Sequence, residues 1–206
     1  MKFKPKINRR KLLYGSIKII IVFFIVFYLF SSPSSIEKEF NNWSYCHKVV
    51  TMYNEIITQK GFIADCVMLD SETGQEYYEL AVGKQKNYLF YKGYSEKIQF
   101  TADSKQDIIE AMDDIGKSVV YYERMFSKYY HGVQYIGGIA PADCVELYVD
   151  SKSATTKKQT IKLNGEYIEM VFWYIVADIN AGGNHYYIDE AGQTHIFDLN
   201  LLIVDE

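Results

Sequence analysis

Residues 62–69 read FIADCVML, and the expected fold class follows from this stretch. A short apolar run with branched and aromatic side chains is typical of a β-strand. The run stops at residues 70–74, DSETG, where polar side chains and a glycine indicate a turn. We therefore expect the stretch to begin an antiparallel meander.

Similar runs recur along most of the chain. The 19 tyrosines and 12 phenylalanines, with only 3 prolines, favour an ordered, strand-rich structure. Asn164-Gly165 and Glu190-Ala191-Gly192 are hairpin signals. The expected strands are 62–69, 77–82, 87–91, 97–100, 133–136, 144–149, 159–163, 167–176, 184–188, 194–197 and 201–204.

Two segments have a helical spacing of their apolar residues. Residues 47–59 form the first, and Gly61 ends it. The second begins at Asp103, with Ser104 as the capping residue and Asp107 completing a capping box. Its apolar stripe consists of Ile108, Ile109, Met112, Ile115, Val119, Tyr122 and Phe126.

These elements predict an α+β domain of two helices and antiparallel sheet. Residues 64–69, ADCVML, are echoed by residues 142–147, ADCVEL, and each copy lies downstream of a Val-Val pair. The echo favours a duplicated helix-plus-meander unit with halves at 43–102 and 103–206. Chance similarity is the alternative.

A basic tail precedes a long apolar run at the start of the chain. Residues 12–30 carry one charge, Lys18, and no acidic residue occurs before Glu37. As a helix, this run would be about 28 Å long, close to the thickness of a bilayer core. Positive charge stays on the cytoplasmic side, so we expect an N-terminal transmembrane helix with the rest of the chain outside.

The competing interpretation of the apolar run is a cleaved signal peptide. Such a peptide needs small residues at its cleavage site, where this chain has Ser32-Pro33-Ser34 after a bulky apolar run. We favour the uncleaved anchor. The expected organisation is a cytoplasmic tail at 1–11, an anchor at 12–30, a spacer at 31–42 and an extracytoplasmic domain at 43–206.

The charge is distributed unevenly. Of the 22 basic residues, 15 follow Phe30, together with all 26 acidic residues, which gives that part a formal charge of about −11. An acidic domain repels nucleic acid, so we expect no nucleic-acid partner and, beyond the anchor, no binding to anionic lipid. A basic protein partner would suit it, whereas solubility alone is the simpler explanation of the acidic excess.

The three cysteines do not form a disulfide-built scaffold. If 47–59 were a helix packed on the following strand, Cys46 and Cys66 would come level, because that helix rises about 20 Å and the strand returns about 17 Å. We therefore expect a Cys46–Cys66 disulfide. The rival pairing is Cys66 with Cys144, and three free thiols is the third alternative.

Two histidines, His185 and His195, fall in one expected hairpin. With a three-residue loop they would lie directly opposite each other, and with a four-residue loop they would face opposite sides. Asp189 or Asp198 would have to complete a metal site. Because two histidines alone make an incomplete site, we expect neither a metal nor a cofactor.

An enzyme would most readily use a cysteine nucleophile here. Cys144 would attack, His185 or His195 would act as base, and Asp198 would orient the base. The adjacent Asp143 raises rather than lowers a thiol pKa, which disfavours this site. Without a catalytic constellation, the sequence favours a membrane-anchored protein-binding domain of a bacterial envelope. An immunity protein or an accessory subunit of an envelope or secretion complex would fit, and a Cys/His hydrolase is the alternative.

Overall fold

The computed structural model describes residues 17–25, 36–43, 46–57, 61–87, 92–127, 130–177, 179 and 183–199. Within these ranges, residues 17–25 are helical, and no helix is long and apolar enough to cross a membrane. The basic tail, the rest of segment 12–30 and the expected strand 201–204 lie outside the described residues. The anchor therefore stays a prediction from the sequence.

The protein is α+β and mostly β, as expected. Its strands pair antiparallel throughout the described sheets. The elements are α2 (Ile36–Trp43), β1 (His47–Ile57), β2 (Gly61–Asp70), β3 (Glu76–Asn87), β4 (Lys92–Ala102), α3 (Lys105–Asp113), a 3₁₀ turn (Ile115–Ser118), β5 (Val120–Ser127), β6 (Tyr130–Ala140), β7 (Cys144–Val149), β8 (Lys152–Ser153), β9 (Thr155–Leu163), β10 (Glu166–Ile175), β11 (His185–Asp189) and β12 (Thr194–Ile196).

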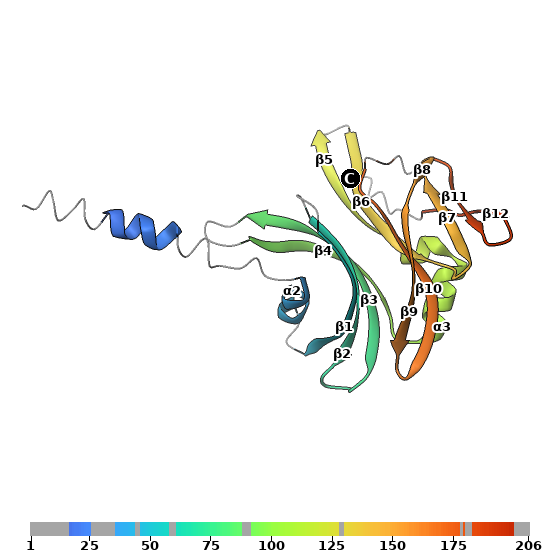
Figure 1. Cartoon of the computed structure of the whole chain (residues 1–206), viewed down its shortest axis with the longest axis horizontal. Coiled ribbons are helices and arrows are strands. Elements are labelled where there is room, and N and C mark those ends of the chain that lie inside the picture. The colour runs from blue at the N-terminus through green and yellow to red at the C-terminus, as the bar shows by residue number, and fades with distance from the viewer. Residues whose placement is uncertain are drawn as a thin grey trace, which may run out of the picture.

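The strands form three sheets that stack in layers. Sheet A has the order β1-β2-β3-β4, sheet B the order β5-β6-β10-β9, and sheet C the order β12-β11-β7-β8. From left to right, Figure 1 shows α2, sheet A, sheet B and then sheet C. Each neighbouring pair of layers shares its own buried apolar cluster. Sheet C is therefore the outermost layer on the side opposite α2.

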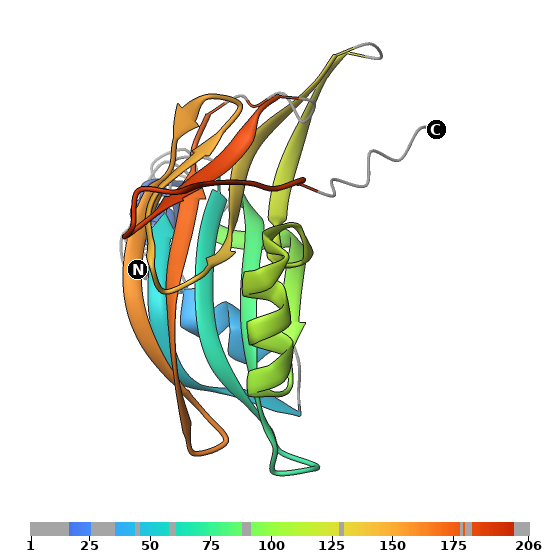
Figure 2. The same cartoon turned by 90° about the vertical axis from the view of Figure 1, so that its right-hand side faces the viewer.

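The largest apolar cluster lies between sheets A and B. Alternate side chains of β2 and β3 meet alternate side chains of β10, with Ile63, Leu80 and Phe172 all fully buried or nearly so. The helix α3 adds Ile108 and Ala111 to the same cluster; Figure 2 shows this helix in front of the strands. Because β10 is apolar on both faces, it can lie in the middle of the stack.

The other face of β10 packs Trp173 into the cluster between sheets B and C. Gly138 is the register partner of Trp173 on β6, and a Cβ at Gly138 would lie 2.8 Å from the indole ring. Gly137 faces the other way, where a Cβ would lie 3.2 Å from Ile63. The Gly137-Gly138 pair, which sequence alone suggests is a turn, is therefore a mid-strand gap that lets a large side chain approach on each face.

A buried carboxylate joins sheets A and B. Asp65 on β2 is fully buried and accepts hydrogen bonds from Asn54 (2.6 Å) and Tyr78 (2.9 Å) of sheet A. Gln159 on β9 donates to the same carboxylate across the layer, at 2.6 Å. Lys157 Nζ lies 2.6 Å from the Asn54 side-chain oxygen. Burial raises the pKa of Asp65, while these donors oppose the rise.

The packed unit starts before residue 43, where the sequence places the end of a spacer. Ile36 and Phe40 of α2 are buried on the outer face of sheet A, and the Phe40 ring contacts Phe62 edge-on at 6.1 Å. The side chain of Asn41 accepts a hydrogen bond from the backbone of Val49 at 2.8 Å. The four-residue spacing of the two apolar side chains puts both on one helix face, which is why this short segment covers the sheet.

The predicted helix at 47–59 is wrong, because this segment is strand β1. Its pairing with β2 shifts register between Val49 and Thr51 and again between Met52 and Asn54. Each irregularity interrupts the two-residue alternation of a regular strand. Val49 and Met52 consequently pack toward α2, while Tyr53 packs toward sheet B. Two bulges in a strand thus produce the same three-to-four residue spacing as a helix.

The second predicted helix is correct at its start and too long. Ser104 and Asp107 form the expected capping box. The helix then ends at Asp113, a 3₁₀ turn follows, and residues from Val120 form β5 instead of further helical turns. Val120 pairs with Gly137 at the start of a ladder with β6, so tertiary pairing outweighs the helical spacing.

The expected duplication is not seen in the strand order. The first half is a helix followed by the consecutive meander of sheet A, whereas the second half distributes its strands over sheets B and C. The two echoed segments become β2 and β7, which lie in different sheets with different neighbours. Asp65 is buried in the first copy, and its counterpart Asp143 is exposed in a turn. The echo therefore reflects similar strands without a repeated unit.

Candidate binding surface

Three strands of sheet C bring three outward side chains into one row. Tyr186 of β11 is paired in register with Tyr148 of β7 on one side and with Ile196 of β12 on the other. Successive strand residues point to opposite faces. Leu147 and Tyr187 accordingly face the cluster shared with sheet B, and the row faces away from the stack.

The row is apolar and accessible. The rings of Tyr148 and Tyr186 are stacked, with centroids 4.9 Å apart and planes 18° from parallel. The side chain of Ile196 is 86% exposed, an unusual state for a large apolar residue in a strand. We call Glu146, Tyr148, Tyr186, Ile188, Thr194 and Ile196 the outer face of sheet C.

Carboxylates surround this row. Tyr148 donates its hydroxyl hydrogen to Glu146 Oε2 at 2.7 Å, and this bond raises the pKa of the phenol. Residues 143–154 and 183–199 contain one lysine, Lys152, and no arginine. That lysine lies 3.8 Å from Asp150. The acidic residues of these two segments are Asp143, Glu146, Asp150, Asp189, Glu190 and Asp198. Of these, Glu190 pairs with Lys158 of β9 at 3.2 Å.

The candidate metal-binding histidines lie on the inner face of sheet C. The hairpin is centred on Ala191 instead of Glu190, so His195 pairs with Tyr187 in register, not with His185. The His195 ring stacks on Tyr187 at 4.6 Å, and its Nε2 lies 2.8 Å from Asp189 Oδ2, which lowers the pKa of that carboxyl.

His185 is separately engaged. Its Nδ1 accepts the backbone N–H of Asp150 at 3.1 Å, and its ring packs on Phe197. Among the described side chains, no three histidine, cysteine or carboxylate groups gather as metal ligands would. Both histidines have structural partners in the hairpin.

The Cys144, His185 and Asp198 arrangement proposed for a hydrolase is not assembled. Cys144 pairs with Asp189 at one end of the β7–β11 ladder, and His185 pairs with Val149 at the other. The Cys144 thiol donates to the carbonyl oxygen of Glu146 at 3.7 Å. Burial and the nearby Asp143 raise its pKa to about 12, so the thiolate needed for attack is disfavoured. Asp198 is exposed.

The expected Cys46–Cys66 disulfide is not formed in this structure, where none of the three cysteines is in a disulfide. The carbonyl of Cys46 accepts the N–H of Ser71 at 2.6 Å, whereas Cys66 pairs with Met52 in register. Six residues of extended chain between Cys46 and Met52 separate the two thiols by about 20 Å. Disulfides need Cα atoms within about 7 Å. The pairing argument failed because it assumed a helix at 47–59.

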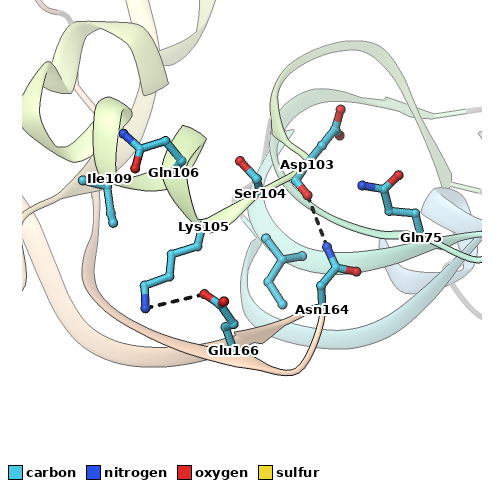
Figure 3. Close-up of a pocket in the computed structure, with 9 residues that line it drawn as sticks. Gln75, Asp103, Ser104, Lys105, Gln106, Ile109, Asn164 and Glu166 are labelled. Atoms are coloured by element: carbon cyan, nitrogen blue, oxygen red, sulfur yellow. Dashed lines mark hydrogen bonds and ion pairs between the residues drawn. The ribbon is translucent and has the colours of Figure 1, made fainter.

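A cavity of about 650 Å³ lies at the N-terminus of α3 and is lined by both polar and apolar side chains. Figure 3 shows Lys105 facing Glu166, at 3.5 Å, and Asn164 reaching the backbone of Asp103. Asn164 also exchanges hydrogen bonds with Glu76 and so fastens the β9–β10 turn to sheet A. A second cavity of about 300 Å³ lies next to it. The charged and amide groups named here bond to one another. We therefore do not choose these cavities as the candidate functional site.

Comparison with protein-family models, curated proteins and solved structures gave no match. The candidate site is therefore chosen from the geometry of the structure alone. Tyr186 and Tyr187 place one ring on each face of sheet C, as alternation along a strand requires. The sequence analysis missed Tyr148 and Ile196, since only strand pairing brings them beside Tyr186. The apolar–polar alternation of β7 and β12 was the available signal.

Proposed function

We propose that this chain is a membrane-anchored, extracytoplasmic protein-binding domain that captures a basic protein on the outer face of sheet C. The observation that carries the proposal is the row Tyr148–Tyr186–Ile196, an apolar surface at the end of the layer stack and bordered by carboxylates. Tyrosine side chains in such rows are common binding anchors.

The apolar row and the nearby carboxylates should contribute to binding in different ways. Covering an exposed isoleucine side chain is worth about 1.5–3 kcal/mol, and an anchoring tyrosine can contribute about 2 kcal/mol or more. Surrounding carboxylates act mainly on the rate and specificity of encounter with a positive partner. We expect the apolar row to supply most of the affinity, and Glu146 and Asp198 to select a basic partner.

The proposed location rests on the sequence. The basic tail and segment 12–30 fit a single-pass anchor in the inner (plasma) membrane with the N-terminus in the cytoplasm. A domain held outside a bacterial membrane that recognises a basic protein could act as an immunity protein against a toxin. An accessory subunit of an envelope or secretion complex would use the same surface.

The experiment is affinity capture with the tagged full-length chain in native membranes, followed by titration of the purified partner. Ile196→Ser and Tyr186→Ser should each weaken binding about tenfold or more, equivalent to about 1.4 kcal/mol. Tyr167→Ser is the matched control, because Tyr167 is also exposed but lies on β10. Equal binding by all three variants would contradict the proposed site.

A further inference from the structure

Sheet C has two edge strands among the described residues, β8 and β12, and the row of apolar side chains ends at β12. The N–H of Phe197 donates to the carbonyl of His185, and the N–H of Asp189 donates to the carbonyl of Gln193, both at 3.1 Å. In an antiparallel ladder, hydrogen-bonded and non-hydrogen-bonded pairs alternate. The pair Tyr187–His195, midway between these two, is therefore hydrogen-bonded.

The pairs on either side of Tyr187–His195 are non-hydrogen-bonded pairs. They are Ile196 with Tyr186 and Thr194 with Ile188. The backbone N–H and C=O groups of Thr194 and Ile196 consequently point away from β11, toward the open edge. Within the described residues, β11 is the only strand paired with β12.

Natural proteins usually protect such an edge with lysine, proline, a bulge or a covering segment. The residues of β12 are Thr194, His195 and Ile196, which include neither lysine nor proline. No register shift interrupts their pairing with β11. Among the described residues, the short length of the strand is the one such protection that we identify.

We propose that the basic partner adds a β-strand to β12 and so extends sheet C. This inference rests on the proposed function and specifies how the partner is held. Backbone groups of the added strand would bond to Thr194 and Ile196, and its apolar side chains would extend the row from Ile196. A basic side chain two positions along from an apolar one would share its face and would lie near Asp198, which is two residues after Ile196 and is exposed.

The charge of the edge selects this occupant over a second copy of the chain. Pairing β12 with β12 of a second copy would bring a second Asp198 to the same edge, where this carboxylate is exposed. An added strand that carries an apolar residue and a lysine or arginine two positions apart, on the same face, faces no such repulsion. The favoured occupant is therefore an extended basic segment.

The test uses the full-length chain and a synthetic peptide in which valine and lysine take alternate turns at every second position, separated by threonines, so that both lie on one face. Binding should slow amide hydrogen exchange at Thr194 and Ile196, whose N–H groups point away from β11. Thr194→Pro removes one outward N–H without removing a bond to β11 and should weaken peptide binding about tenfold. Thr194→Ala, which keeps that N–H, is the matched control and should bind normally.

The outcomes separate the two proposals. Suppose that Ile196→Ser abolishes binding, while Thr194→Pro binds normally and the exchange rates do not change on binding. Strand addition is then wrong, and the outer face of sheet C remains the proposed binding surface. If none of these substitutions matters, the surface itself is wrong. Failure of the peptide to bind at all, or equal binding by a glutamate–valine peptide, overturns the basic-strand proposal. The exchange measurement on the unmodified chain decides the matter even if Thr194→Pro does not fold.

Discussion

Tyr148 on β7 and Tyr186 on β11 stack on each other at 4.9 Å on the outermost layer of the molecule. Stacked aromatic pairs contribute about 0.5–1.5 kcal/mol beyond the area that they bury. This pair lies on the exposed side of sheet C, whereas the apolar cluster that holds the sheet lies on the other side. Its rings are therefore available for contact with a partner.

The first prediction concerns this pair. The double substitution Tyr148→Ser with Tyr186→Ser should lower the free energy of unfolding by about 1–2 kcal/mol while greatly weakening partner binding. Urea denaturation and titration of the captured partner measure the two effects. A loss of binding that is fully explained by unfolding would contradict the surface, and Tyr167→Ser again serves as control.

The second prediction concerns pH and the buried Asp65. Its unfolded carboxyl titrates near 3.8, and burial raises the folded pKa. Between these two pKa values the folded state binds more protons than the unfolded state, so this residue makes stability fall as pH rises through that window and remain lower above it. The free energy of unfolding of the wild type, minus that of Asp65→Asn, should decrease as pH rises above about 4. A constant difference would contradict the assignment.

The third prediction concerns the contact between Gly138 and Trp173. A methyl group at Gly138 would lie 2.8 Å from the indole, so Gly138→Ala should destabilise the fold by about 1–3 kcal/mol. The nearest ring atoms are Cε2, Cζ2 and Nε1. Trp173→Phe should therefore destabilise the Gly138→Ala protein less than it destabilises the wild type. Thermal melts of the four proteins in this cycle test the contact, and strict additivity would show that it is absent.

The fourth prediction concerns the thiols. Non-reducing peptide mapping should find no disulfide among Cys46, Cys66 and Cys144. Cys46 is the one partly exposed thiol of the three, so iodoacetamide should label it first and label the others on unfolding. A hydrogen bond to Glu72 raises the pKa of Cys46, so Glu72→Gln should speed its labelling at pH 8. Faster labelling of Cys144 in the folded protein would instead support the hydrolase.

The fifth prediction concerns topology. Protease added outside spheroplasts should digest the domain beyond Ser35 and spare segment 12–30, because a basic tail holds the N-terminus in the cytoplasm. Mass spectrometry of the protected fragment measures this. A mature protein that begins near Ser35 and is free of the membrane would show a cleaved signal peptide.

Local sequence patterns predicted some elements well. The strand at 144–149 and the capping box at Ser104 and Asp107 are both confirmed. A cap depends on residues within one helical turn, so the sequence contains all the information needed. The segment at 47–57 failed for the opposite reason: its bulges exist only in relation to β2, which determines where the ladder slips.

The sequence by itself determined which segments are apolar and alternating, where most turns fall, and that the part after Phe30 carries a large acidic excess. These properties depend on residues close together in the chain. The tertiary structure alone decided that Gly138 makes room for Trp173, that Asp65 joins two sheets, and that Ile196 continues the row of Tyr148 and Tyr186. Each of these is a pairing between distant segments, because strand order and register arise only when the sheets assemble.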